Sequence, residues 1–209
     1  MTPLSRRAFG TAALTALLAG CDDNGNGRSA TVHPAGTRAG TPDTGDVTPG
    51  VGSSRPLRRS VPVRLRIPAI GVDTPLLSLG LEPDGTVQVP PVTAHDQAGW
   101  YRYSPTPGQV GPSVVLGHVT VGSYGDGVFR HLDRLRTGET INARLENGTQ
   151  AQFAVTSTRT VAKARFPADD VYGNVDRPEL RLITCGGPRD DDGYRDNVIV
   201  FAALSATLR

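Results

Sequence analysis

Apolar and polar side chains alternate along several short stretches of this chain. In residues 61–67, apolar side chains at 63, 65 and 67 alternate with arginines, which is typical of a strand with one buried face. Further apolar segments follow at short spacing, and Asn147-Gly148 between two of them is a strong hairpin signal. We expect strands over 61–67, 72–81, 86–90, 114–118, 140–145, 150–157, 180–185 and 197–204. So many strands, with short helical turns expected only at 128–135 and 167–172, favour a mostly β fold built as a closed barrel.

The first residues have the pattern of an export signal. Residues 5–9 (Ser-Arg-Arg-Ala-Phe) form a twin-arginine pattern, and the apolar run at 8–19 is too short to span a bilayer as a helix. The run ends in Leu-Ala-Gly-Cys, which resembles the lipobox of bacterial lipoproteins. That resemblance implies cleavage before Cys21 and a diacylglyceryl anchor on its sulfur. The alternative is an ordinary signal peptide with a chance cysteine near its cleavage site.

Composition divides the rest of the chain into two parts. Residues 22–60 are rich in Gly, Pro and Thr and have almost no large apolar side chains. Such a segment cannot bury enough surface to offset the entropy lost on ordering, so it is expected to be a disordered tether. We therefore assign residues 1–21 to the signal, 22–60 to the tether and 61–209 to one folded domain.

The folded domain is close to neutral, which argues against a nucleic-acid partner. From residue 61 onward it has 15 Lys and Arg against 16 Asp and Glu, with no basic stripe. The acids at 190–192 lack the ligand spacing of an EF-hand, and no histidine pair has the spacing of a zinc site. We expect no metal and no cofactor.

Three residues near strand ends suit the chemistry of a thiolate. Cys185 and His118 each end a predicted strand, and Cys185 is expected to open directly into a glycine-rich turn that admits a substrate backbone. A neighbouring cation lowers the pKa of a thiol, and an imidazolium can later protonate a leaving amine. Arg195 can stabilise an oxyanion, and Thr184 can add a hydrogen bond at the same place. The expected reaction is acyl transfer through a thioester.

Several short motifs occur in order over nearly all of residues 61–209. Residues 116–118 read Leu-Gly-His, 182–185 read Leu-Ile-Thr-Cys, and 194–197 read Tyr-Arg-Asp-Asn. These motifs resemble those of sortases, the cysteine transpeptidases of Gram-positive cell surfaces. Their signature is commonly Thr-Leu-x-Thr-Cys, and this chain has Arg181 in place of the first threonine. Cys-Gly-Gly-Pro at 185–188 and the 194–197 motif resemble the class F sortases of high-GC Gram-positive bacteria in particular.

The resemblance implies a fold, a catalytic trio and a substrate class. The fold is a sortase-type closed eight-stranded β-barrel with one or two short helices, and the trio is His118, Cys185 and Arg195. The implied reaction cleaves a sorting motif of the Leu-Pro-x-Thr-Gly kind between Thr and Gly, and transfers the acyl group to an amine of peptidoglycan or a pilin. With a lipid on Cys21, the protein is expected as a monomer on the outer face of the cytoplasmic membrane, facing the cell wall. The usual sortase anchor is a transmembrane helix, so the lipobox changes the anchor but leaves the side of the membrane the same.

Four alternatives accompany this hypothesis. Water could take the acyl group, which would make the protein an endopeptidase. The L,D-transpeptidases also place a histidine before a cysteine, but their Ser-x-Gly-Cys signature is not matched at 182–185. A disulfide between Cys21 and Cys185 suits an exported protein, but it would block both proposed roles. The remaining alternative is a non-catalytic surface lipoprotein that uses the barrel as a binding module.

Overall fold

The computed structural model describes residues 55–190 and 193–209, about half of which form β-strands. The twin-arginine segment, Cys21 and most of the predicted tether lie outside these residues. The strands are β1 (Pro62–Ile67), β2 (Val72–Leu79), β3 (Ala98–Tyr101), β4 (Gly111–Leu116), β5 (Thr120–Val121), β6 (Gly125–Asp126), β7 (Thr140–Leu145), β8 (Gln150–Ala162), β9 (Pro178–Asp190) and β10 (Gly193–Leu208). The helical turns are η1 (Pro68–Ile70), η2 (Val92–Ala94), η3 (Gly122–Tyr124), η4 (Leu132–Arg134), η5 (Lys163–Arg165) and the α-helix α1 (Ala168–Tyr172).

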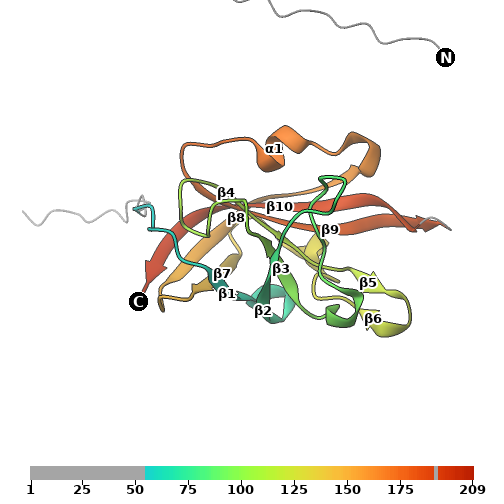
Figure 1. The fold of residues 1–209 in the computed structure, drawn as a ribbon, viewed down its shortest axis with the longest axis horizontal. Coiled ribbons are helices and arrows are strands. Elements are labelled where there is room, and N and C mark those ends of the chain that lie inside the picture. Colours follow the sequence, from blue (N-terminus) through green and yellow to red (C-terminus); the bar gives the residue numbers. More distant parts are fainter. Residues whose placement is uncertain (1–54, 191–192) are drawn as a thin grey trace, which may run out of the picture. The chain divides into compact units, whose positions relative to one another are not determined.

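Eight of these strands close into a barrel (Figure 1). The order around the barrel is β1-β2-β3-β4-β9-β10-β8-β7, while β5 and β6 form a separate two-stranded sheet. Two neighbouring pairs, β2 with β3 and β4 with β9, are parallel, and the others are antiparallel. The predicted closed eight-stranded barrel is confirmed. No helix in the described ranges is long and apolar enough to cross a membrane.

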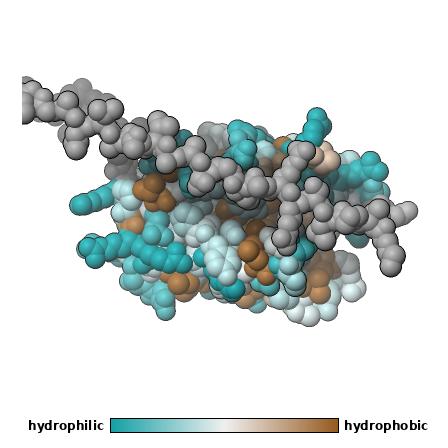
Figure 2. Space-filling model, turned by 45° about the horizontal axis from the view of Figure 1, so that its top comes forward, coloured by the Kyte–Doolittle hydropathy of each residue, from teal (hydrophilic) through white to brown (hydrophobic). Residues whose placement is uncertain are grey.

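Side-chain alternation along β9 separates two apolar clusters. Leu180 and Leu182 face the barrel interior, where they pack with Phe153 and other fully buried side chains. Ile183 faces the opposite side and belongs to a second cluster with Val171 of α1. The connection between β8 and β9, which contains α1, therefore covers the outer face of β4, β9 and β10 (Figure 1). Beyond these clusters, hydrophilic side chains with separate hydrophobic patches make up the coloured surface in Figure 2.

The expected strand at 86–90 does not form. Leu81 and Val87 make an isolated bridge, and the side chain of Gln88 accepts a hydrogen bond from the Gly80 N–H at 2.7 Å. The segment ends in Pro90 and Pro91, which have no N–H to donate to a ladder, so pairing cannot continue. These residues instead form a loop that reaches His118, as described below.

The expected glycine-rich turn directly after Cys185 is also wrong. β9 continues through Pro188 to Asp190 and pairs with β10, which begins at Gly193 rather than at 197. The ladder continues because a register shift between Tyr194 and Asp196 lies across from Pro188, which cannot donate a hydrogen bond. The result is a long β9–β10 hairpin that projects from the same end of the barrel as β5 and β6 (Figure 1).

Residues just before β1 pack on the barrel. The Leu57 N–H donates to the Gly108 carbonyl at 2.8 Å, and the Leu57 side chain packs against the interior cluster. The Ser60 N–H donates to Thr106 Oγ1 at 3.3 Å. These contacts attach residues 55–60 to the folded domain.

Candidate active site

Three adjacent strands bring Cys185, His118 and Arg195 to one end of the barrel. The parallel strand β4 ends opposite Ile183 of β9, so His118, two residues later, lies at the level of Cys185. On the other side of β9, Asn197 of β10 is paired with Cys185, and Arg195 precedes it by two residues. The register thus places Cys185 in the middle of the three.

Cys185 lines a cavity of about 370 Å³ at this end of the barrel. The thiol is partly exposed and forms no disulfide among the described residues. The cavity wall includes Phe129 and Val198 from the interior cluster, and the charged side chains of Arg130 and Asp133. The thiol is therefore accessible to a molecule that enters from solvent.

The two glycines after Cys185 are required by the packing of β10. A Cβ at Gly186 would lie 2.6 Å from Val198 Cγ2, and one at Gly187 would lie 2.1 Å from Asp196 Oδ2. Gly187 also has a φ of 70°, a left-handed conformation that side chains other than glycine disfavour. The absence of side chains at these glycines therefore makes room for Val198 and Asp196 of β10. This role is additional to the one predicted from the sequence, which is to leave space for a substrate beside Cys185.

Thr184 lies beside the thiol with an unsatisfied hydroxyl. Its residue is 4% exposed, and its Oγ1 has no hydrogen-bond partner in the described part of the chain. Thr184 also lines the cavity that Cys185 lines. A buried hydroxyl without a partner is costly, so this position favours a ligand atom that would accept or donate a hydrogen bond.

His118 is held in place by the loop before β3 and by the chain after β6. Its Nε2 lies 2.6 Å from the Pro90 carbonyl oxygen, which can only accept, so Nε2 carries the proton of this bond. Gly127 packs directly on the His118 backbone, because a Cβ there would lie 2.3 Å from the His118 carbonyl oxygen. The ring is partly buried and is not part of the described wall of the Cys185 cavity.

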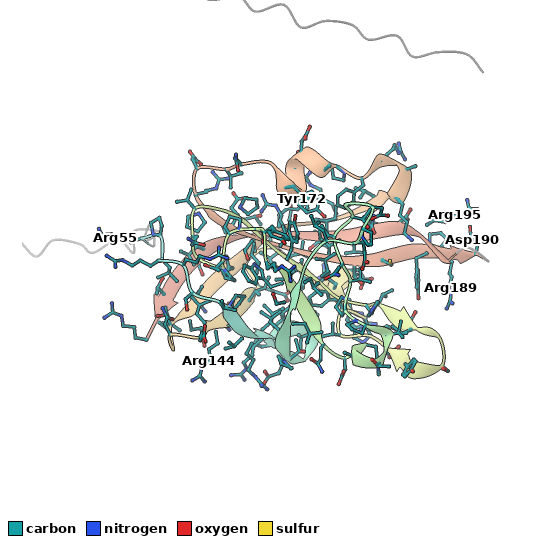
Figure 3. All side chains as sticks on the ribbon, viewed as in Figure 1. Arg55, Arg144, Tyr172, Arg189, Asp190 and Arg195 are labelled. Carbon is teal, nitrogen blue, oxygen red and sulfur yellow. The ribbon has the colours of Figure 1, made fainter. Side chains whose placement is uncertain are left out.

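Arg195 lies on the projecting hairpin and points toward Asp190. Its Nε donates to Asp190 Oδ2 at 2.5 Å, and its side chain is 70% exposed. Figure 3 shows Arg195, Asp190 and Arg189 together near the end of the hairpin. The backbone of the predicted trio is thus assembled, but the guanidinium is not part of the described wall of the Cys185 cavity.

Arg181, the unusual residue of the cysteine motif, is buried. It is 3% exposed, and its Nη2 donates to the carboxylate of Glu179 on the same strand. Its Nε donates to the Asp170 carbonyl of α1 at 3.3 Å, and its guanidinium carbon lies 4.6 Å from the Phe201 ring centroid. Arg181 therefore attaches α1 to the outer face of the barrel and does not face solvent.

A second hollow, of about 440 Å³, lies on that outer face. It is lined by Val114 of β4, by Tyr172 at the end of α1, and by side chains of the loops around β3, including Tyr101. The rings of Tyr101 and Tyr172 have centroids 6.4 Å apart, and burial together with the neighbouring Tyr101 raises the pKa of Tyr172. In Figure 3, Tyr172 lies between α1 and the barrel. This hollow is aromatic and apolar in character.

A family model described as a sortase domain matches residues 65–205. The match covers more than half of the 209 residues. The chain belongs to the sortase family. No curated protein matches it.

Solved sortases share the fold at low sequence identity. Sortase A of Listeria monocytogenes has a TM-score of 0.54 at 17% identity, over 71% of this chain and 90% of that one. The SrtA sortase from Actinomyces oris has a TM-score of 0.53 at 22% identity, over 77% and 89%. Sortase C-1 from Actinomyces oris has a TM-score of 0.54 at 20% identity, over 69% and 73%. With the family match, this likeness makes the chain a sortase-type transpeptidase, of a family that in general acts on surface proteins and pilins.

Sequence reasoning missed several residues around the thiol of this sortase. Asp133 and Tyr194 line the Cys185 cavity, and Pro90 contacts His118 across 28 positions of sequence. The Tyr194 hydroxyl lies 2.7 Å from Thr120 Oγ1, which joins β10 to β5. Pro90 lies in a loop and Asp133 in a short turn, and Tyr194 lies beside a register shift in β10, so no hydrophobic period signals their direction. The Tyr-Arg-Asp-Asn motif at 194–197 was the one available signal for Tyr194, and it was interpreted as a signal for Arg195 instead.

Proposed function

We propose that this sortase is a class F-like cysteine transpeptidase that cleaves a Leu-Pro-x-Thr-Gly-type motif between Thr and Gly. The observation that carries the proposal is the placement of Cys185 between His118 and Arg195 at one end of three adjacent strands, in a sortase barrel. The acyl group passes to an amine of peptidoglycan or a pilin. The same family and the same strand ends make a non-catalytic binding module the weaker choice.

In the first half-reaction, the Cys185 thiolate attacks the Thr carbonyl carbon of the motif. A C–S bond forms, the carbonyl π electrons move to oxygen, and the tetrahedral intermediate then breaks its C–N bond. The imidazolium of His118 gives its proton to the leaving glycine amine, and a thioester remains on Cys185.

The oxyanion requires a donor, and the candidates are Thr184, which lines the Cys185 cavity, and Arg195 on the neighbouring strand. The Thr184 hydroxyl has no partner in the described residues, so a substrate oxygen would satisfy it. Arg195 must exchange Asp190 for the substrate, and an exposed ion pair of this kind is worth at most about 1 kcal/mol. The exchange therefore costs little, and it would free Arg195 to donate to a bound substrate.

The outer hollow is suited to the apolar start of the motif. Val114 precedes His118 by four residues, or about 13 Å along an extended strand. The Leu and Thr of the motif are three residues apart, or about 10 Å when extended. A peptide with its Thr carbonyl at the level of Cys185 would extend its Leu toward the aromatic wall that contains Tyr172, while its Pro would lie nearer to Cys185. This placement gives the motif its apolar selectivity.

The N-terminal segment supplies the location. We propose that Cys21 carries the lipid anchor, that a Gly/Pro/Thr-rich tether follows and ends before residues 55–60, which pack on the barrel, and that the monomeric domain acts on the outer face of the cytoplasmic membrane. The twin-arginine pattern and the Leu-Ala-Gly-Cys run support this arrangement. Surface proteins with the sorting motif and an amine acceptor at the cell wall would then lie within reach.

The test combines the purified full-length chain with a fluorogenic Leu-Pro-x-Thr-Gly peptide and a glycine-rich amine, with products identified by mass. The expected result is cleavage between Thr and Gly with the amine joined to Thr, and no product from Cys185→Ala. Absence of product, together with a Cys185 thiol that reacts slowly with a labelling reagent at every pH tested, would overturn the proposal. Cleavage with water alone as acceptor would indicate an endopeptidase.

A further inference from the structure

Two separate hollows lie on the two faces of the barrel wall, and Cys185 lines one of them. The apolar hollow is floored by Val114, which belongs to the outer cluster beneath α1. The Cys185 cavity is lined instead by Phe129 and Val198, which belong to the interior cluster at the mouth of the barrel. A peptide in the first hollow would leave the second one open, and the thiol borders the second.

The charges in the Cys185 cavity leave one carboxylate without a partner. Arg130 is already paired, since its Nε lies 3.0 Å from Asp126 Oδ1. Asp133, the other charged residue in the wall, has no hydrogen bond or ion pair with any described residue. The cavity therefore offers a negative group to an incoming molecule, beside the buried, unpartnered hydroxyl of Thr184.

The turn that carries Asp133 is rigidly attached to the strand that carries His118. The Phe129 N–H donates to the His118 carbonyl at 2.9 Å, and the Leu132 N–H donates to the Phe129 carbonyl at 3.1 Å. Leu132 is fully buried, and the Leu135 carbonyl accepts a hydrogen bond from Thr158 Oγ1 at 2.8 Å. The carboxylate is thus held by a packed segment and not by a loose loop.

We propose that this cavity is the site of the amine acceptor, and that Asp133 binds the acceptor as an ammonium ion. This inference rests on the proposed function, because the acceptor attacks the thioester on Cys185. A primary amine is mostly cationic near neutral pH, and a carboxylate attracts it more strongly than it attracts water. Asp133 therefore raises the occupancy of amine over water beside the thioester and selects transfer over hydrolysis.

The second half-reaction then balances as follows. The bound ammonium loses one proton to solvent at the open side of the cavity, and the neutral amine attacks the thioester carbonyl carbon. A C–N bond forms, the C–S bond breaks, and the sulfur leaves as a thiolate. The second amine proton passes to His118, which was left neutral when it protonated the first leaving amine.

The test uses the full-length chain and measures the KM for acceptor, the kcat and the ratio of transfer to hydrolysis. Glycinamide, mostly cationic near neutral pH, is compared with hydroxylamine, which is mostly uncharged. Asp133→Asn should raise the KM for glycinamide about tenfold, the factor expected for one charge-assisted hydrogen bond, and shift products toward hydrolysis. The KM for hydroxylamine should change little, and Asp133→Glu should restore the affinity for glycinamide.

Asp176→Asn is the matched control, because Asp176 is an exposed carboxylate just before β9, away from the cavity. It should leave both KM values unchanged. Acyl-enzyme is followed by mass in the same samples. If the acyl-enzyme forms and Asp133→Asn uses glycinamide as well as the native chain does, this acceptor site is wrong while the proposed function stands. If no acyl-enzyme forms, the proposed function fails and the acceptor site falls with it.

Discussion

Replacement of Arg181 by methionine tests the view that this residue is structural. The guanidinium is enclosed by Glu179, by the Asp170 carbonyl of α1 and by the Phe201 ring. The two charged side chains of the pair are 4% and 10% exposed. Methionine fills a similar volume without charge, so the variant removes one partner and leaves the carboxylate of Glu179 buried.

The expected loss follows from the remaining contacts of Glu179. Removal of one partner of a buried ion pair costs about 3–5 kcal/mol, because the other charge is left uncompensated. Arg177 still donates to Glu179 Oε1 at 2.6 Å, but its own side chain is 68% exposed and compensates only in part. We therefore expect the free energy of unfolding to fall by about 3 kcal/mol, the lower end of this range, which corresponds to a fall in Tm of about 6–12 °C.

A double variant separates the uncompensated charge from other effects. With Glu179→Leu added to Arg181→Met, the buried charge disappears, and most of the lost stability should return, since apolar replacement of a buried pair is often neutral or better. Unfolding in urea, followed by tryptophan fluorescence of Trp100, gives the free energies. Arg64→Met is the matched control: it removes an exposed pair with Asp73 and should leave the urea midpoint unchanged.

Two results would refute this reasoning. One is an Arg181→Met variant as stable as the native chain, which would mean that the ion pair contributes nothing. The other is a double variant no more stable than the single one, which would assign the loss to the contacts with Asp170 and Phe201. A change in peptide selectivity without loss of stability would instead return Arg181 to a role in substrate recognition.

Three further predictions concern the strand end, the outer hollow and the core. Gly127→Ala should lower kcat about 100-fold without change in far-UV circular dichroism, because its Cβ would displace His118; an active variant would show that the contact can relax. Burial raises the pKa of Tyr172 in the folded state. The stability that the neutral Tyr172 side chain contributes is therefore complete below the ordinary tyrosine pKa, and it is lost as the pH rises through the raised pKa of the folded state. Native chain should therefore lose stability in alkali relative to Tyr172→Phe, which parallel pH titrations of unfolding would confirm or contradict. Phe153→Ala should cost about 3–5 kcal/mol in urea unfolding, and a smaller loss would indicate a core that collapses around the cavity.

The sequence was sufficient for several strands of the barrel because alternation is a local signal, but it missed β3. Strands β1, β7 and β8 begin within a residue of their predicted starts, since one face of each is buried and the other is polar. The hairpin expected at Asn147-Gly148 also joins β7 to β8. Strand ends were less predictable, because β9 and β10 extend each other beyond Cys185 by pairing across the hairpin, and that pairing is not visible in either segment alone.

The candidate site, like the fold, has features that the sequence predicts and features that it does not. That His118 and Cys185 lie at the same level of neighbouring strands follows from the motifs and the register together, although Cys185 lies within β9 and not at its end. The hydrogen-bond partners of the His118 and Arg195 side chains could not be predicted from the sequence. Arg195 faces Asp190, and His118 faces Pro90, because the pairing of β9 with β10 and the packing of residues 80–97 decide these contacts, and no hydrophobic pattern signals either. The catalytic assignments therefore stay predictions, even though the strands that carry them are confirmed.

The departure at Arg181 links the motif to both hollows. Positions 181, 183 and 185 share the outer face of β9, so a residue at 181 touches what covers that face before it touches any substrate. Here the cover is α1, and Arg181 holds it through the Asp170 carbonyl, two residues before Tyr172 in the wall of the apolar hollow. A small polar residue at 181 could not reach that carbonyl, so we expect the arginine to hold α1, and with it the wall proposed to bind the peptide, in place. Substrate selectivity at 181 would then be exerted through the position of α1, and variants of Arg181 should alter the KM for peptide before they alter the chemistry at Cys185.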